Sequence, residues 1–121
     1  MGGVTHLEIP ASDTGRAQTF WNDFQGWQFQ AMEGPIEYHM TQIAEGQGGA
    51  IYPAEGGEQG MRPYFDVDDI QKGAARVREL GGQADDPGPV PGMGWYATCT
   101  DTEGNKFGIW QNDPSAAPPS E

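Results

Sequence analysis

The chain of 121 residues carries 6 basic and 18 acidic side chains, a formal net charge of −12, and one cysteine. A surface of this sign repels phosphate backbones and anionic membranes, so we expect neither nucleic-acid nor membrane partners. One cysteine excludes an intrachain disulfide, and Cys99, in the middle of an expected strand, reads as a buried, inert thiol. The sequence shows neither a secretory leader nor an apolar run of about 18 residues, which favours a cytoplasmic protein.

The first half of the chain predicts one strand, one helix and three further strands. Residues 4–9 alternate in polarity until Pro10, and Asp13 is a typical helix N-cap. Apolar residues spaced i, i+3, i+4, i+7 then predict a helix over 14–24 that ends at Gly26. Short strands follow at 27–32, 37–43 and 49–52, separated by glycine-containing turns.

The second half predicts the same order again. RPYFDV (62–67) reads as a strand, Asp69 as an N-cap, and an apolar stripe predicts a helix over 70–80 that ends at Gly81-Gly82. The expected strands are 83–84, 95–100 and 106–111, with GPVPGMG and DTEGN as connecting turns.

The two halves superpose at a constant offset of 56 residues. Asp13 falls on Asp69, Gly26 on Gly82 and Gly48 on Gly104. The pattern therefore predicts an α+β fold of two tandem βαβββ modules. We expect them in a single domain over 1–113, with module one at about 1–56 and module two at about 57–113. The Pro/Ser/Ala-rich residues 114–121 are expected to be a disordered tail.

This arrangement resembles the vicinal oxygen chelate superfamily, which includes glyoxalases, bleomycin-resistance proteins and extradiol dioxygenases. The resemblance runs through VTHLEIPASDTGRAQTFWNDFQGWQF, YFDVDDIQKGAARVRELGG and VPGMGWYATCTDTEGNKFGIWQ, with the terminal turn and strand the most characteristic piece. It implies a curled mixed sheet around a central cavity, with the helices on the outside. The cavity holds a metal, a ligand or both, and the fold does not decide which.

In the metal-dependent members of this superfamily, each module supplies one ligand from its first strand and one from its last. The resemblance places His6 at the first ligand position, and the offset gives Arg62, Gly108 and Tyr52 as its counterparts. Arginine repels a cation and glycine has no donor, so His6 is the only family ligand retained. We therefore expect no cofactor and no bound divalent metal.

Two displaced metal sites are also compatible with the sequence. Strand alternation predicts that His6, Glu8 and Asp66 lie on the sheet face that lines the cavity, called the inward face below, where they could form the first site. In the second, His39 completes a 2-His-1-carboxylate set. The second requires His39 to face inward, and the sequence does not decide which face of strand 37–43 does so. An ordinary strand position is the simpler interpretation of His39.

Without a metal, the predicted inward face is a mixed polar and aromatic surface suited to a small molecule. His6 and Glu8 are the candidate catalytic residues. The candidate ligand-binding residues are Tyr52, Arg62, Tyr64, Asp66, Trp95, Tyr96 and Trp110. Two alternatives remain open. In the first, Arg62 bridges Glu8 or Asp66 and fills the cavity, so that nothing is bound. In the second, one of Trp95 and Tyr96 packs in the core instead of lining a mobile flap at the mouth of the cavity.

The sequence therefore predicts a protein that binds a small organic ligand, with aromatic molecules among the candidates. The alternatives are a lyase or isomerase that uses His6 and Glu8 as acid–base groups, or a metal-dependent enzyme of the glyoxalase type. From the resemblance we also expect a homodimer.

Overall fold

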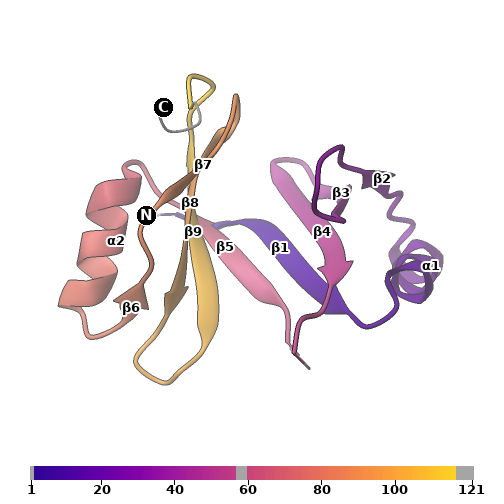
Figure 1. The fold of residues 1–121 in the computed structure, drawn as a ribbon, viewed down its shortest axis with the longest axis horizontal. Coiled ribbons are helices and arrows are strands. Elements are labelled where there is room, and N and C mark those ends of the chain that lie inside the picture. Colours follow the sequence, from indigo (N-terminus) through magenta and orange to yellow (C-terminus); the bar gives the residue numbers. More distant parts are fainter. Residues whose placement is uncertain (1, 57–59, 117–121) are drawn as a thin grey trace. The chain divides into compact units, whose positions relative to one another are not determined.

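The computed structural model describes residues 2–56 and 60–116. The chain divides into an N-terminal unit, His6–Arg62, and a C-terminal unit, Met1–Thr5 together with Pro63–Glu121. Each has one helix and several strands, which confirms the α+β class and the repeated strand–helix–strand order (Figure 1). The first residues go with the C-terminal unit because the Gly3 carbonyl accepts a hydrogen bond from the Asp66 N–H, at 3.0 Å.

The elements follow the predicted order with one addition, a strand inside the expected GPVPGMG turn. Their bounds are β1 Val4–Ala11, α1 Thr14–Gln25, β2 Gln30–Ala31, β3 His39–Ala44, β4 Gln47–Pro53, β5 Arg62–Asp66, α2 Ile70–Glu79, β6 Gln83–Ala84, β7 Gly88–Val90, β8 Gly94–Thr100 and β9 Lys106–Asn112.

The N-terminal unit is a small sheet in the order β2-β3-β4-β1, with α1 alongside. Strands β3 and β4 form an antiparallel hairpin, and β4 runs parallel to β1. Helix α1 begins where predicted, because the Asp13 carboxylate accepts the Arg16 N–H at 2.9 Å. It ends at Gly26, whose φ of 75° is the left-handed conformation that glycine adopts without strain. No residue of α1 is fully buried.

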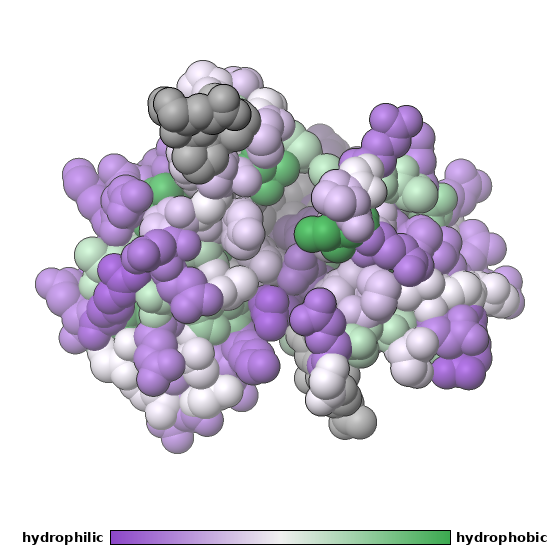
Figure 2. Space-filling view, in the orientation of Figure 1, coloured by the Kyte–Doolittle hydropathy of each residue, from purple (hydrophilic) through white to green (hydrophobic). Residues whose placement is uncertain are grey.

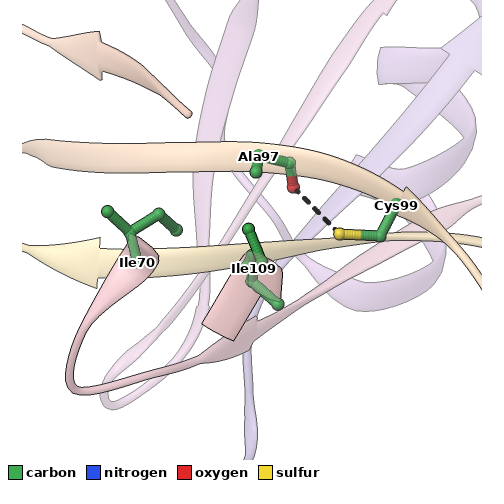
Figure 3. Packing of buried hydrophobic residues seen from close by; sticks show 5 residues of the cluster. Ile70, Ala97, Cys99 and Ile109 are labelled. Atoms are coloured by element: carbon green, nitrogen blue, oxygen red, sulfur yellow. Dashed lines mark hydrogen bonds between the residues drawn. The ribbon is translucent and has the colours of Figure 1, made fainter. Parts of the chain in front are cut away.

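The C-terminal unit contains β5 parallel to β9, β8 antiparallel to β9, and β6 and β7 paired with β8. Helix α2 begins at the predicted cap, where the Asp69 carboxylate accepts the Lys72 N–H at 3.0 Å. Figure 3 shows the core of this unit, in which Ile70 of α2 meets strands β8 and β9. The buried cluster comprises Ile70, Ala74, Ala97, Cys99 and Ile109.

Cys99 is confirmed as a buried thiol, 5% exposed. Desolvation raises the pKa of this thiol above its ordinary value, and the nearby Asp85 carboxylate raises it further. A thiol so protonated is a poor nucleophile, which agrees with a structural role.

Three local predictions were wrong. The first residues of the GPVPGMG segment form β7, because they pair with Gly94–Tyr96 of β8. The expected strand over 27–32 is reduced to the two residues of β2. Residues 114–116, which were expected to belong to a disordered tail, are ordered, because the carbonyl of the buried Ala116 accepts the Gly92 N–H at 2.8 Å. Residues 117–121 lie outside the described residues.

The internal repeat persists, but its offset changes along the chain. The two helix N-caps, Asp13 and Asp69, keep the offset of 56. In the sheet, Ile9 of β1 lies opposite Ile51 of β4, and its repeat counterpart Phe65 lies opposite Ile109. Residue 51 therefore corresponds to residue 109, an offset of 58. The two extra residues of the second half fall between the helix and the last two strands.

The surface reflects the composition. Figure 2 shows hydrophilic residues over most of the visible face, as expected for a chain with a net charge of −12. Within residues 2–56 and 60–116, neither helix is long and apolar enough to cross a membrane.

Candidate functional site

One face of the sheet in the N-terminal unit gathers polar side chains. His6 and Glu8 alternate with Leu7 along β1 and so lie on the same face. Glu8 lies opposite Ala50, and Ala50 lies opposite Met40 of β3, so Met40 shares that face. This register settles the orientation that the sequence left open. Tyr38 and Met40 face the same side as His6, and His39 faces the other side.

Three side chains at the centre of this face, those of His6, Tyr38 and Glu8, form a hydrogen-bonded line, called the polar line below. The Tyr38 hydroxyl donates to Oε2 of Glu8 at 2.9 Å. The same hydroxyl oxygen lies 2.8 Å from Nε2 of His6, whose ring stacks on the tyrosine with centroids 6.3 Å apart. A histidine and a carboxylate that are two residues apart in sequence are therefore joined through a residue 30 positions away.

The directions of these hydrogen bonds assign the histidine tautomer. A hydroxyl has one proton, and Tyr38 gives it to the acceptor-only carboxylate of Glu8. The contact with His6 is then a bond from Nε2–H to the Tyr38 oxygen. In the neutral ring, Nδ1 therefore carries the lone pair. This nitrogen lies toward Gly48, where a β-carbon at residue 48 would be 3.3 Å away.

Arg62 joins the line at its carboxylate end. Its Nη1 lies 3.6 Å from Oε1 of Glu8, and the two side chains are only 20% and 15% exposed. The bridge between Arg62 and Glu8 that the sequence left as an alternative is thus present. With solvent largely excluded, the guanidinium neutralises a carboxylate that would otherwise be costly to bury.

Burial sets the protonation state of His6. Desolvation lowers the pKa of His6 below 6.5, because a charged imidazolium loses hydration there, and the Glu8 charge opposes this shift without reversing it. His6 is therefore neutral at pH 7. A neutral imidazole with a lone pair on Nδ1 can accept a hydrogen bond or a proton.

The residues at the family metal positions do not fit a metal. The offset of 58 in the last strands makes Ala50 the counterpart of Gly108, so the earlier pairing of Gly108 with Tyr52 was wrong. Both last-strand positions then lack a donor, and the Arg62 guanidinium occupies the remaining first-strand position. Within residues 2–56 and 60–116, no group of three His, Cys, Asp or Glu side chains is arranged to hold a metal ion.

The Tyr64 ring occupies the space that a side chain at residue 108 would need. Tyr64 lies directly opposite Gly108 in the register of β5 and β9. A β-carbon at residue 108 would contact the tyrosine ring, lying 2.7 Å from Cζ. A larger residue at this position therefore requires Tyr64, which is 6% exposed, to move.

The alternative that used His39 as a metal ligand is contradicted. His39 points away from His6, and its Nε2 lies 2.7 Å from Oε2 of Glu37. That carboxylate also accepts the Thr14 hydroxyl at 2.6 Å, which ties the start of α1 to the segment before β3. The other alternative combines His6 and Glu8 of the N-terminal unit with Asp66 of the C-terminal unit, and it stays a prediction.

The predicted ligand-binding residues divide between the units. Tyr52 lies with the polar line, its ring centroid 6.4 Å from that of Tyr38. In the C-terminal unit, Trp110 is directly opposite Tyr96 and Asp66, and all three share the sheet face of Tyr64. Trp95 lies on the opposite face, packed against the α2 cluster, with its Nε1 donating to Asp113 at 3.0 Å. Of the two aromatic residues after the glycine-rich loop, Trp95 is the one in the core.

Tyr38 is the site residue that the sequence reasoning missed. The signal was present in the repeat. The offset of 58 makes Tyr38 the counterpart of Tyr96, which had been selected in the second half. An offset fixed at 56 gives Met40 as the counterpart of Tyr96, so it does not point to Tyr38.

A hollow of about 620 Å³ lies elsewhere in the N-terminal unit, between the end of β1 and α1. Its wall includes Ile9, Ala17, Phe20 and Trp21, and it includes none of His6, Glu8 or Tyr38. This hollow belongs to the helix side of the sheet and is separate from the polar line.

Solved structures of other proteins share the fold. A hypothetical protein from Bacillus halodurans matches with a TM-score of 0.72 at 16% identity, covering 96% of this chain and 98% of that one. A methylmalonyl-CoA epimerase in complex with methylmalonyl-CoA matches with a TM-score of 0.70 at 15% identity, covering 98% and 99%. A Streptomyces coelicolor methylmalonyl-CoA epimerase matches with a TM-score of 0.68 at 13% identity, covering 96% of this chain and 98% of that one. At these identities the likeness concerns the fold alone.

Sequence relationships give the family. A protein from Didymella fabae, described as a glyoxylase-like domain-containing protein, is 33% identical over 119 residues, covering 89% of this chain and 92% of the relative. The model of the glyoxalase-like domain matches residues 6–110. The chain belongs to the glyoxalase-like domain family, and with it to the vicinal oxygen chelate superfamily.

Proposed function

We propose that this protein binds a small organic molecule against the polar sheet face of its N-terminal unit, without a metal. The observation that carries the proposal is the line from His6 through Tyr38 to Glu8, with Arg62 at its end. Such half-buried polar groups cost stability unless they are paired, and convergent polar groups of this kind orient ligands in small-molecule sites. The neutral His6 and the paired Glu8 and Arg62 favour a ligand of low net charge.

The structural neighbours add one general point. Two of them are complexes with methylmalonyl-CoA or 2-nitronate-propionyl-CoA, so the fold accommodates acyl-CoA ligands in those proteins. Their substrates are not carried over to this chain, because identities of 13% and 15% establish only the fold.

A thermal-shift screen of small organic molecules tests the proposal. A bound ligand raises the melting temperature, because it stabilises the folded state by mass action. For ligands of low net charge that do so, we expect His6→Ala and Tyr38→Phe to weaken binding at least fivefold. Tyr96→Phe is the matched control, since it removes the counterpart hydroxyl in the C-terminal unit. A screen that finds no ligand whose binding is weakened by His6→Ala and Tyr38→Phe would contradict the proposal.

A second candidate function is proton transfer, and the tautomer of His6 favours it. With Nε2–H bonded to Tyr38, Nδ1 is the basic atom, and the tyrosine connects the ring to the Glu8 carboxylate. Such a line can pass a proton from the imidazolium to the carboxylate after Nδ1 has accepted one from a substrate. This is the acid–base chemistry of a lyase or isomerase.

Hydrogen–deuterium exchange tests this candidate. Carbonyl compounds and thioesters with acidic α-protons are incubated with the protein in D₂O and followed by proton NMR. We expect catalysed exchange that His6→Ala abolishes and Tyr38→Phe slows more than tenfold, with no change on adding a chelator. Exchange that survives both substitutions, or that requires added metal, would contradict it.

The metal-free state and the homodimer are also proposals. Elemental analysis of protein purified without chelator should find well under one equivalent of zinc, nickel, iron or manganese, and a full equivalent would overturn the first. Sedimentation equilibrium should give about twice the mass of 13.1 kDa, and a monomer at all concentrations would overturn the second.

A further inference from the structure

The C-terminal unit has an aromatic surface where the N-terminal unit has its polar line. By register, Tyr96 is the counterpart of Tyr38, Trp110 of Tyr52, and Tyr64 of Glu8. In the C-terminal unit, Tyr64, Tyr96 and Trp110 thus place aromatic side chains on one face of β5, β8 and β9. No hydrogen-bonded histidine–carboxylate pair occupies this face among the residues that the structure describes.

The rings of Tyr96 and Trp110 lie close to the neighbouring strand backbone. The Tyr96 ring rests beside Gly88 of the neighbouring strand, where a β-carbon would be 3.5 Å from Cε1. The Trp110 ring lies over Gly94, where a β-carbon would be 2.6 Å from Cζ2. Its indole N–H donates to Asn112 at 2.8 Å, which fixes the ring orientation. Tyr96 is 38% exposed, so its ring is accessible from solvent.

Charge at this face favours a cation. Asp66, an exposed residue of β5, lies directly opposite Trp110 and on the same face. The basic residue that β9 adds to this face is Lys106, four residues from Trp110 and therefore about 13 Å along the strand. The indole ring offers its negative π face to a cation, and a net charge of −12 attracts cations to the whole protein.

We propose that the C-terminal unit binds a planar aromatic cation on the surface formed by Tyr96, Trp110 and Asp66. The flat ring of the ligand stacks on the indole and phenol rings, and its positive charge lies near the Asp66 carboxylate. Neutral and anionic molecules of the same shape obtain the stacking and lack the charge interaction. This site is distinct from the polar line and does not depend on it.

Isothermal titration calorimetry with three planar tricyclic probes tests the proposal: proflavine as the cation, acridone as the neutral ring and 9-anthracenecarboxylate as the anion. Proflavine should bind at least tenfold more tightly than the other two. Trp110→Leu should weaken proflavine binding at least tenfold, whereas Trp110→Phe, which keeps an aromatic face, should weaken it two- to fivefold. Circular dichroism of each variant establishes that it is folded.

Asp66→Asn and Asp68→Asn form the matched pair, because both remove one exposed acidic charge and only Asp66 lies in the register of Trp110. We expect a three- to tenfold loss for Asp66→Asn and less than twofold for Asp68→Asn. Equal losses, equal binding of the three probes, or no effect of Trp110→Leu would each overturn the site. His6→Ala should leave proflavine binding unchanged, so this proposal and the proposed function fail independently.

Discussion

The two units share a strand–helix–strand plan and differ in what they place on it. Both helices begin at an aspartate N-cap, Asp13 or Asp69, whose carboxylate accepts a backbone N–H three residues on. On the sheet, the N-terminal unit has His6, Glu8 and Tyr38 in a hydrogen-bonded line, whereas the C-terminal unit has aromatic rings at the matching positions. The residues that start the helices are thus shared, and the residues on the sheet face differ.

The helices show the same contrast in packing. Helix α2 buries Ile70 and Ala74 against its sheet, whereas α1 has no buried residue and leaves Phe20 and Phe24 58% and 65% exposed. Aromatic side chains on α1 instead contact one another and Trp27, whose ring stacks on Trp21 at 4.9 Å. The C-terminal unit therefore has the better-packed core of the two.

The largest expected effect separates the two helices. Ile70→Ala should lower the free energy of unfolding by about 2–5 kcal/mol, since it opens a cavity in the α2 cluster. Phe24→Ala should cost less than about 1 kcal/mol, because its side chain is mostly exposed and loses only ring contacts. Urea unfolding of both variants measures the difference. Equal losses would show that α1 is packed as tightly as α2.

The next effect concerns the small residues of the last strands. Gly108→Ala should cost about 1–3 kcal/mol, because the new methyl group collides with the Tyr64 ring. Its counterpart Ala50→Gly should cost about 0.5–1 kcal/mol, mainly through chain entropy. Repeating Gly108→Ala in a Tyr64→Leu background should make the cost smaller. If the costs of Gly108→Ala and Tyr64→Leu simply add in the double variant, the collision between the new methyl group and the Tyr64 ring is not the cause of the destabilisation.

A smaller effect distinguishes the counterpart tyrosines. Tyr38→Phe should cost about 1 kcal/mol for each of the two hydrogen bonds that it removes, to His6 and Glu8. Tyr96→Phe should change stability by less than about 0.5 kcal/mol, as for an exposed substitution. Thermal or urea unfolding compares the two variants at one pH. A cost for Tyr96→Phe as large as that for Tyr38→Phe would remove this distinction.

The smallest effect is a dependence on pH that belongs to the N-terminal unit. Because the native pKa of His6 is below its ordinary value of 6.5, the unfolded chain takes up the proton first as the pH falls. The contribution of His6 to stability should therefore decrease from about pH 6.5 down through the native pKa and stay constant below it. His6→Gln should flatten this part of the stability curve, measured by urea unfolding between pH 5 and 8. An unchanged slope would show that another group is responsible.

Much of the architecture could be predicted from the sequence, because it depends on local signals. Asp13, Asp69 and Gly26 act through hydrogen bonds and backbone angles within a few residues of themselves, so their roles are readable in a single sequence. The alternation of polarity over residues 4–9 agrees with the structure, since Ile9 is buried.

The candidate site could be predicted only in part. Strand alternation placed His6 and Glu8 on one face, and a bridge from Arg62 to Glu8 or Asp66 was an alternative that the sequence left open. The structure brings Arg62 to Glu8. Tyr38 could not be placed, because the face of strand 37–43 depends on its register with β4, which no local signal records. The same register shows that Ala50 and not Tyr52 corresponds to Gly108, which a repeat with one fixed offset conceals.

The sequence by itself thus determined the repeated modules, the helix boundaries and the residue types available for chemistry. The tertiary structure decided which of those residues meet: Tyr38 joins His6 to Glu8, Trp95 turns into the core, and Trp110 lies opposite Asp66. The physical reason is that caps and alternation act over a few residues along the chain. Strand register instead depends on pairing between distant segments, where a shift of one residue would exchange the two faces of a strand.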